Sequence, residues 1–240
     1  MKKMENLEEI KEEKVKYEEV IRSISYNQKE ILANIIRLHN NGEPFFADMT
    51  YSTGKFYSES KDEKFYVPQP IVKLDVCPQT DDTIEIDAWG KLPFEDNSIP
   101  SLVIDLPFVI SPKNAPSMQK LDDDGSNIIA KRFSSYYPVK EMFDSYSHWI
   151  LEAYRVLAVN GICVFKSQAT VSGGCQLMTP EYSWYVATKV GFYTLDQFFL
   201  LAQNRLHSGK IKKQQHARKY SSTFYVFKKG GKKVEYPNFE

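Results

Sequence analysis

Four aspartates stand at or just after the ends of short apolar segments, where they could do chemistry together. They are Asp48, Asp75, Asp87 and Asp105. Carboxylates accept hydrogen bonds from hydroxyl and amine groups, so acids along the carboxyl edge of a parallel sheet could hold the sugar and the polar tail of a nucleoside. A single aspartate after a strand is more often a turn or helix-cap residue. Four in succession favour a binding edge.

Positive charge collects near the C-terminus. Residues 197–234 contain no acidic residue but ten Lys and Arg, although Lys+Arg and Asp+Glu both total 31 over the chain. In residues 205–220 the basic side chains alternate with His, Gln and Tyr, a mixture typical of a phosphate-binding element. The alternative is a solvated tail, which the apolar segments on either side disfavour. The residues predicted to contact nucleic acid are Lys210, Lys212, Lys213, Arg218 and Lys219.

The composition indicates one globular domain with a large core. The chain has 240 residues, of which 42% are hydrophobic and 14% aromatic, enough for one large α/β domain and incompatible with global disorder. Three cysteines and four histidines at unrelated spacings argue against a disulfide framework or a metal site. The N-terminus is charged where a signal peptide needs an apolar core, and no run is long enough to span a membrane. We therefore expect a soluble cytoplasmic protein.

Short apolar runs predict the strands that position the aspartates. They cover residues 44–47, 70–74, 83–86, 101–104, 161–165 and 222–227, and buried strands of this kind are typical of a parallel sheet. Apolar residues that recur every three or four positions predict helices over 27–40, 139–157, 181–190 and 195–204. Residues 1–24 predict a charged helix with a narrow apolar stripe, which would lie on the domain or contact a partner. Residues 109–138 and 206–221 predict long loops.

Taken together, these segments resemble class I S-adenosylmethionine-dependent methyltransferases of the amino-methylating type, particularly small phage and prophage DNA methylases. The resemblance covers roughly residues 43–228. Residues 46–54, FADMTYSTG, look like the cofactor loop of this family, and residues 105–108, DLPF, look like its Asp-Pro-Pro-aromatic catalytic motif. Residues 92–98 resemble its adenine-contacting segment, and residues 149–166 resemble its turn into the fifth strand.

The resemblance implies a cofactor, S-adenosylmethionine, and the residues that bind it. Among them the acid at position 75 would hold the ribose, and the pair at 87 and 88 would lie near the adenine. The implied cofactor-binding residues are Asp48, Thr50, Gly54, Asp75, Asp87 and Ala88. The loop departs from the family pattern because it has one glycine where relatives have two or three.

The resemblance also implies the catalytic residues Asp105, Leu106, Pro107 and Phe108. An exocyclic base amine is a poor nucleophile because its lone pair is delocalised into the ring. The Asp105 carboxylate and the Leu106 carbonyl could hold its two N–H groups and turn the lone pair toward the methyl donor. Phe108 would stack on the base, with a core aromatic as the alternative. Relatives have Pro at position 106, but Leu offers the same carbonyl.

The predicted fold is a Rossmann-like α/β domain with a mostly parallel seven-stranded sheet, in which the last strand, residues 222–228, is antiparallel. Residues 1–41 would form a helical extension, residues 42–234 the methyltransferase domain and residues 235–240 a tail. Within the domain, residues 109–138 would be a target loop and residues 205–220 a basic loop.

The resemblance implies methylation of adenine N6 in DNA. Family analogy alone favours adenine over cytosine N4, since the cytosine enzymes commonly have Ser where Asp105 stands. Cytosine C5 chemistry is rejected because Cys77-Pro78 reverses the Pro-Cys order that it needs. RNA remains the alternative substrate. A non-catalytic nucleic-acid-binding subunit is the alternative of another class, and a homodimer or partner protein could use the N-terminal helix.

Overall fold

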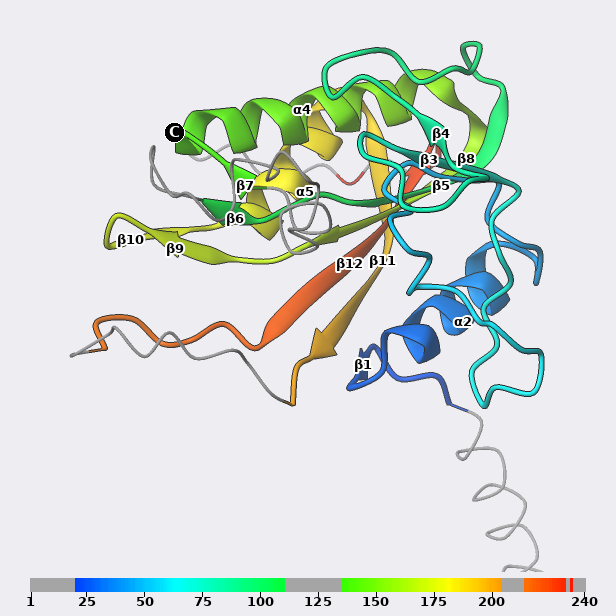
Figure 1. The fold of residues 1–240 in the computed structure, drawn as a ribbon, viewed down its shortest axis with the longest axis horizontal. Helices are drawn as coiled ribbons and strands as arrows, with labels where there is room; N and C mark the ends of the chain where they lie inside the picture. Colours follow the sequence, from blue (N-terminus) through cyan, green and yellow to red (C-terminus); the bar gives the residue numbers. More distant parts are fainter. Residues whose placement is uncertain (1–19, 111–134, 204–213, 232–233, 235–240) are drawn as a thin grey trace, which may run out of the picture.

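The main sheet of the computed structural model has eight strands, in the order β1-β11-β12-β8-β5-β2-β3-β4 (Figure 1). The structure describes residues 20–110, 135–203, 214–231 and 234. The strands are β1 Ile24–Ser25, β2 Ala47–Asp48, β3 Val72–Asp75, β4 Ile84–Glu85, β5 Ile99–Asp105, β8 Leu157–Ser167, β11 Phe192–Leu201 and β12 Ser221–Lys229. Two small sheets pair β6 Val109–Ile110 with β7 Ser135–Tyr136, and β9 Thr170–Ser172 with β10 Cys175–Leu177.

Within the described part of the main sheet, every strand is parallel to the others except β12, which is antiparallel to both of its neighbours. The predicted Rossmann-like α/β fold with an antiparallel last strand is confirmed. From β2 the chain moves outward to β3 and β4 and then returns to β5 on the other side of β2. The crevice between β2 and β5 is therefore the topological switch point, where open α/β sheets bind ligands.

Over the described residues, the sheet has one strand more than predicted. Residues 24 and 25 form β1, which pairs in parallel with β11 at the edge of the sheet. The predicted helix over residues 1–24 is wrong at this end, because free backbone groups along the edge of β11 pair with the segment. Residues 1–19 of that prediction lie outside the described residues.

In the part of the chain that the structure describes, three helices cover the two faces of the sheet. Helix α2, Gln28–His39, packs on one face, and α4, Val139–Val156, and α5, Thr179–Val190, lie on the other (Figure 1). Asn27 caps α2 by accepting a hydrogen bond from the backbone N–H of Lys29, as expected for an Asx N-cap. The predicted helix over residues 195–204 is wrong, since residues 195–201 belong to β11, where six of them pair with β12.

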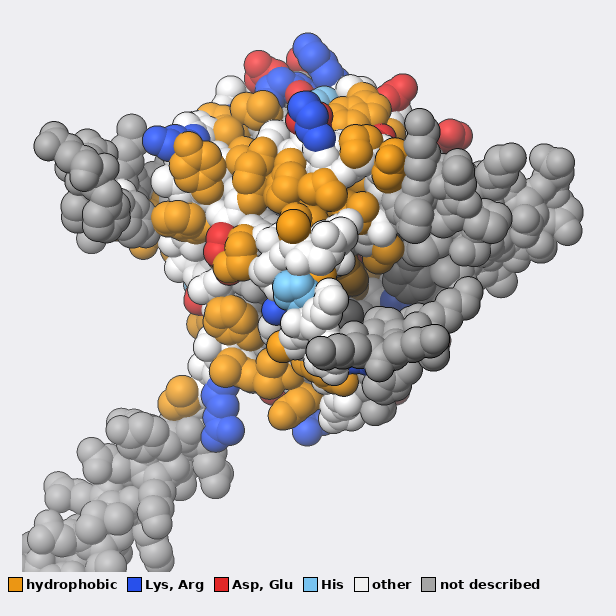
Figure 2. All heavy atoms as spheres, turned by 90° about the vertical axis from the view of Figure 1, so that its left-hand side faces the viewer, with side chains coloured by type: hydrophobic (Ala, Val, Ile, Leu, Met, Phe, Trp, Pro, Cys, Tyr) orange, Lys and Arg blue, Asp and Glu red, His pale blue; other side chains and the backbone are white. Residues whose placement is uncertain are grey.

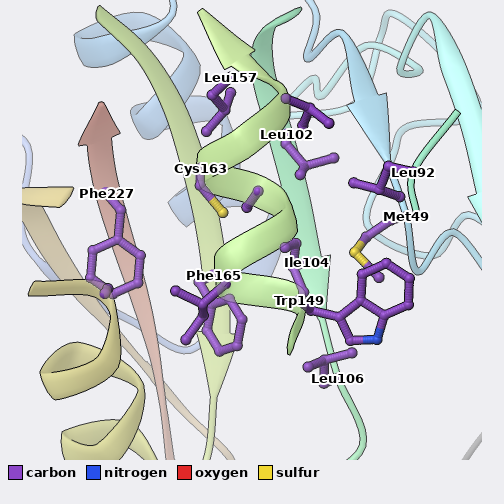
Figure 3. Close-up of a cluster of buried hydrophobic side chains, with 14 of the residues drawn as sticks. Met49, Leu92, Leu102, Ile104, Leu106, Trp149, Leu157, Cys163, Phe165 and Phe227 are labelled. Carbon is purple, nitrogen blue, oxygen red and sulfur yellow. The ribbon is translucent and has the colours of Figure 1, made fainter. Parts of the chain in front are cut away.

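Alternate residues of the central strands supply a core to each face. Leu102 and Ile104 of β5 pack with Trp149 of α4 in one core (Figure 3), whereas Val103 packs with Ile35 of α2 in the other. This alternation follows from the two-residue period of a strand. Both cores hold the end of β5 in place. No helix in the described ranges is long and apolar enough to cross a membrane.

Candidate active site

Three of the four predicted strand-end aspartates are the last residues of their strands. Asp48 ends β2, Asp75 ends β3 and Asp105 ends β5. Because these strands are parallel, all three lie at the same edge of the sheet. Their surroundings differ, with Asp48 1% exposed, Asp75 9% exposed and the Asp105 side chain 25% exposed.

Asp48 is buried beneath the loop that follows β2. Its Oδ2 accepts a hydrogen bond from the Tyr57 hydroxyl at 2.7 Å, and its Oδ1 accepts hydrogen bonds from the backbone N–H and the hydroxyl of Thr50 at 2.8 and 3.1 Å. Burial raises the pKa of Asp48 to about 7, although these hydrogen bonds act in the opposite direction. Asp48 thus holds the loop in place by accepting hydrogen bonds from two of its residues.

Asp75 holds the same loop from the neighbouring strand. Its Oδ2 accepts a hydrogen bond from the Ser52 N–H and its Oδ1 one from the Cys77 N–H, both at 2.8 Å. Burial raises the pKa of Asp75, and the two N–H groups oppose that rise. Each carboxylate oxygen still has a second lone pair that a ligand hydroxyl could use.

The loop after β2 turns tightly at its single glycine. Gly54 has a φ of 68°, in the left-handed region, and a Cβ at this position would lie 2.5 Å from the Tyr51 hydroxyl oxygen. That hydroxyl donates to Gln69 and so cannot move freely away. Glycine is therefore required by the conformation and by the close approach of Tyr51.

Asp105 is connected to both neighbouring strands. Its backbone N–H donates to the Thr50 hydroxyl at 2.8 Å, so Thr50 links Asp105 to Asp48. Its carboxylate Oδ2 accepts a hydrogen bond from the Lys166 ammonium at 2.8 Å. Lys166 lies on β8 opposite Asp105 in the parallel register. A partly buried carboxylate paired in this way is fixed in position.

The rest of the DLPF motif is anchored at two points. The Leu106 side chain is 5% exposed and packs in the core with Trp149 (Figure 3). The Pro107 carbonyl accepts a hydrogen bond from the Tyr146 hydroxyl at 3.0 Å. Packing of the Leu106 side chain thus holds the backbone at the position where the Asp-Pro-Pro-aromatic motif has a rigid Pro. Phe108 is half-buried.

A cavity of about 350 Å³ brings the motif and the loop together. Of the residues predicted to bind the cofactor, Thr50 alone lines this cavity. All four predicted catalytic residues line it, namely Asp105, Leu106, Pro107 and Phe108. Its wall is formed by Gln28, Thr50, Tyr51, Ser52, Thr53, Lys55, Phe56, Asp105, Leu106, Pro107, Phe108, Val109, Lys166, Gln168 and Ser222. The cavity opens at the ends of β2 and β5, which is the switch point of the sheet.

Asp87 and Ala88 do not line this cavity. Both are exposed in the turn after β4, where Asp87 accepts a hydrogen bond from the Trp89 N–H. The following segment is fixed to α4, because the Arg155 guanidinium donates to the Leu92 and Phe94 carbonyls.

The basic loop is described only at its C-terminal end. Lys210, Lys212 and Lys213 lie outside the described residues. Arg218 is exposed and Lys219 half-buried, directly before β12, whose Ser222 lines the cavity. Figure 2 shows hydrophobic side chains over much of the face on the left of Figure 1, with Lys and Arg scattered there rather than gathered in a stripe.

Sequence reasoning missed several cavity residues, of which Lys166 is the most informative. The sequence offers one signal for it, a lysine directly after the apolar run of residues 161–165, but its place opposite Asp105 follows only from the register of β5 and β8. Gln168 is 5% exposed, and its Oε1 accepts a hydrogen bond from the Ser222 hydroxyl. Phe56 and Lys55 come from the loop after β2.

No protein-family model and no curated protein sequence matches the chain. Solved structures resemble it. A Thermus thermophilus protein provisionally described as a DNA modification methylase, solved with S-adenosyl-L-methionine, is 14% identical over 61% of this chain and 53% of its own, with a TM-score of 0.36. An S-adenosylmethionine-dependent methyltransferase from Archaeoglobus fulgidus is 13% identical over 85% and 95%, with a TM-score of 0.43.

The PvuII cytosine-N4-specific DNA methyltransferase is 16% identical over 57% of this chain and 45% of its own, with a TM-score of 0.34. The chain spans about half the length of the Thermus thermophilus protein. Identities of 13–16% and TM-scores of 0.34–0.43 are too low to transfer a function. The function has to come from the site residues themselves.

Proposed function

We propose that the chain transfers a methyl group from S-adenosylmethionine to an exocyclic amine of a nucleic-acid base, with adenine N6 in DNA as the substrate. The observation that carries this proposal is the shared cavity at the switch point. There the Asp105 to Phe108 motif faces the loop after β2, so an acceptor pair for an amine and a loop for a cofactor tail meet in one space.

The geometry suits an aromatic amine. The Asp105 carboxylate and the Leu106 carbonyl are adjacent along the chain, and both residues line the cavity. Acceptors fixed in advance can hold the two N–H groups of an amine and orient its lone pair, which is how positioned polar groups lower a barrier. Phe108, at the same wall, would stack on the base once it has left a helix or is presented in a single strand.

The loop after β2 fits a polar cofactor tail. Thr53 lines the cavity, and its hydroxyl oxygen is one of two buried side-chain polar atoms in the described ranges without a hydrogen-bond partner. Such an atom is costly unless a ligand or water satisfies it. When bound, S-adenosylmethionine supplies a methyl group activated on a sulfonium. Thr50 and Thr53 would hold its methionine part, and Asp75 its ribose.

Nucleic acid is the proposed polymer because the described end of the basic loop directly precedes a strand that lines the cavity. Arg218 and Lys219 precede Ser222, a cavity residue, by only a few positions. Phosphates held by Lys210, Lys212, Lys213, Arg218 and Lys219 would place a base at the cavity. RNA meets the same requirements, and the N-terminal segment could add a second copy or a partner protein.

One observation favours a second candidate, a non-catalytic nucleic-acid-binding subunit. The Asp105 carboxylate already binds the Lys166 ammonium at 2.8 Å, so an amine must share or displace that cation. Together with the single glycine of the loop, this pairing is compatible with a chain that binds nucleic acid for an active partner.

The deciding experiment incubates the full chain with labelled S-adenosylmethionine and DNA or RNA, digests the polymer and identifies the methylated base. N6-methyladenine in DNA supports the proposal, whereas N4-methylcytosine or methylated RNA corrects the substrate. Calorimetry with S-adenosylmethionine runs in parallel. A chain that binds nucleic acid but neither binds the cofactor nor transfers methyl is the non-catalytic subunit.

A further inference from the structure

Lys166 is a cation built into the wall of the cavity. Its side chain is 14% exposed, and its ammonium lies 2.8 Å from Asp105 Oδ2. The ammonium also lies over the rings of Phe56 and Phe224, at 5.0 and 5.6 Å from their centroids. A cation held by a carboxylate and two aromatic faces has a defined position. It is therefore placed to contact the ligand, as well as to balance the charge of Asp105.

Asp105 and Lys166 present an acceptor and a donor side by side. Parallel strands β5 and β8 set these two residues opposite each other, and both line the cavity. An amine that donates to the Asp105 carboxylate is thus brought next to the Lys166 ammonium. The ammonium has three N–H donors, so one can bind Asp105 while another points to the ligand.

We propose that Lys166 determines specificity by donating a hydrogen bond to the ring nitrogen next to the target amine. This inference rests on the proposed function. An acceptor beside a donor is complementary to an amidine edge, in which an amine and a ring nitrogen share one carbon. Adenine offers N6 and N1 in this arrangement, and cytosine offers N4 and N3. Thymine presents the opposite pattern, and an alkyl amine has no acceptor at that distance.

Asp105 and Lys166 then act as one unit. A hydrogen bond to the ring nitrogen draws electron density from the amine, and the carboxylate on the same ammonium offsets this effect. Lys140 is the matched control, because its ammonium also pairs with an aspartate, Asp144 at 2.5 Å, but its side chain is 79% exposed and it does not line this cavity. Its removal leaves the Asp105 pairing intact.

The test compares three sets of single-stranded oligodeoxynucleotides of random sequence, in which every adenine is natural adenine, 1-deazaadenine or 7-deazaadenine. Affinity is measured by fluorescence anisotropy with S-adenosylhomocysteine present, and turnover with labelled S-adenosylmethionine. For the unmodified chain, loss of N1 should lower affinity and kcat/KM by about 10- to 100-fold, as for one charge-assisted hydrogen bond. Loss of N7 should change neither by more than about twofold, since N7 is not part of the amidine.

The variants complete a double-mutant cycle. Lys166→Met should lower kcat/KM on natural adenine by a similar factor and make 1-deazaadenine no worse than adenine. Lys166→Arg should restore part of the discrimination, and Lys140→Met should behave as the unmodified chain. Because the analogue comparison on the unmodified chain needs no substitution, a Lys166 variant that fails to fold does not remove the test.

The outcomes separate the two proposals. Discrimination against 1-deazaadenine in binding without any turnover keeps the role of Lys166 and overturns methyl transfer. Turnover with equal use of adenine and 1-deazaadenine keeps the proposed function and overturns the role of Lys166. If Lys166→Met still discriminates against 1-deazaadenine as strongly as the unmodified chain, another residue binds the ring nitrogen, and the role of Lys166 is overturned. If the unmodified chain shows no discrimination and no turnover, both proposals are overturned.

Discussion

The carboxyl edge of the sheet has a central part, at the ends of β2, β5 and β8, and an outer part, at the ends of β3 and β4. In the central part Asp105 lines a cavity of about 350 Å³. In the outer part Asp75 binds two backbone N–H groups and Asp87 lies exposed in a turn. The same sequence pattern, a short apolar run followed by aspartate, therefore has different roles in the two parts.

The difference follows from the connections between strands. The chain crosses from β4 back to β5 and so leaves a crevice beside β2, and open α/β sheets bind ligands at such a crevice. Beyond it, the loop after β2 reaches over to β3 and takes up Asp75. An aspartate that ends a strand at the switch point is thus a candidate for chemistry. An aspartate that ends the next strand outward is a candidate for loop support.

The largest effect should come from the central part. Asp105→Ala should lower methyl transfer by about 10²- to 10³-fold, because one of two amine acceptors is lost. The affinity for S-adenosylmethionine, measured by calorimetry, should stay nearly constant. Asp144→Ala is the control, since this exposed acid pairs only with Lys140 among its described partners.

Thermal unfolding of Asp105→Ala is measured alongside, because the substitution leaves Lys166 without its carboxylate partner. Full turnover in a folded variant would remove Asp105 from the mechanism. It would also erase the distinction between the central and the outer part.

The next effect, on the affinity for the cofactor, is expected in the outer part. If the Asp75 carboxylate holds the ribose hydroxyls, Asp75→Ala should weaken S-adenosylmethionine by about 1.5 to 3 kcal/mol, as for one charge-assisted hydrogen bond. Asp75 also holds the Ser52 N–H, so a weaker affinity alone would fit loop support equally well.

S-adenosylhomocysteine and its 2′-deoxy analogue separate the two roles. The unmodified chain should prefer the form with the hydroxyl, and Asp75→Ala should bind both alike. Equal affinities in the unmodified chain would mean that Asp75 supports the loop only.

Much of this arrangement could be predicted because it depends on local patterns. The helix predicted over residues 27–40 is Gln28–His39, since Asn27 caps its start through its own side chain. Asp196 to Leu201 could not be predicted as strand, because their pairing with β12 overrides a helical spacing. Lys166 was missed for a similar reason. Its partner Asp105 is 61 residues away in the sequence, so only the parallel register of β5 and β8 brings them together.

The approach to the central part can be tested separately from its chemistry. If Lys210, Lys212 and Lys213 bind phosphates, log affinity for DNA should fall linearly with log salt concentration. Changing all three to Gln should reduce the slope by about 2 to 3, since each phosphate contact contributes roughly 0.7 to 0.9. Methylation of a free nucleoside should stay unchanged. An unaltered slope would make the basic loop a solvated surface and favour a substrate other than nucleic acid.

The last effect is on stability rather than on activity and concerns the acid beneath the central part. Asp48 has an ordinary pKa of 3.8, which burial raises to about 7 in the folded chain. Between these values the folded state keeps a proton that the unfolded state has released. The stability that this group contributes is therefore fully present below pH 4 and is lost as the pH rises through about 7.

Asp48→Asn should remove that part of the pH dependence, because the amide stays neutral. The free energy of unfolding, measured by urea titration from pH 4 to 8, should fall with pH more steeply in the unmodified chain than in the variant. The difference in slope is at most about 1.4 kcal/mol per pH unit for one proton, and it should vanish above the folded pKa. Parallel curves would show that Asp48 is ionised throughout. The hydrogen bonds from Tyr57 and Thr50 would then outweigh its burial, and the acid beneath the cavity would carry a charge next to Asp105.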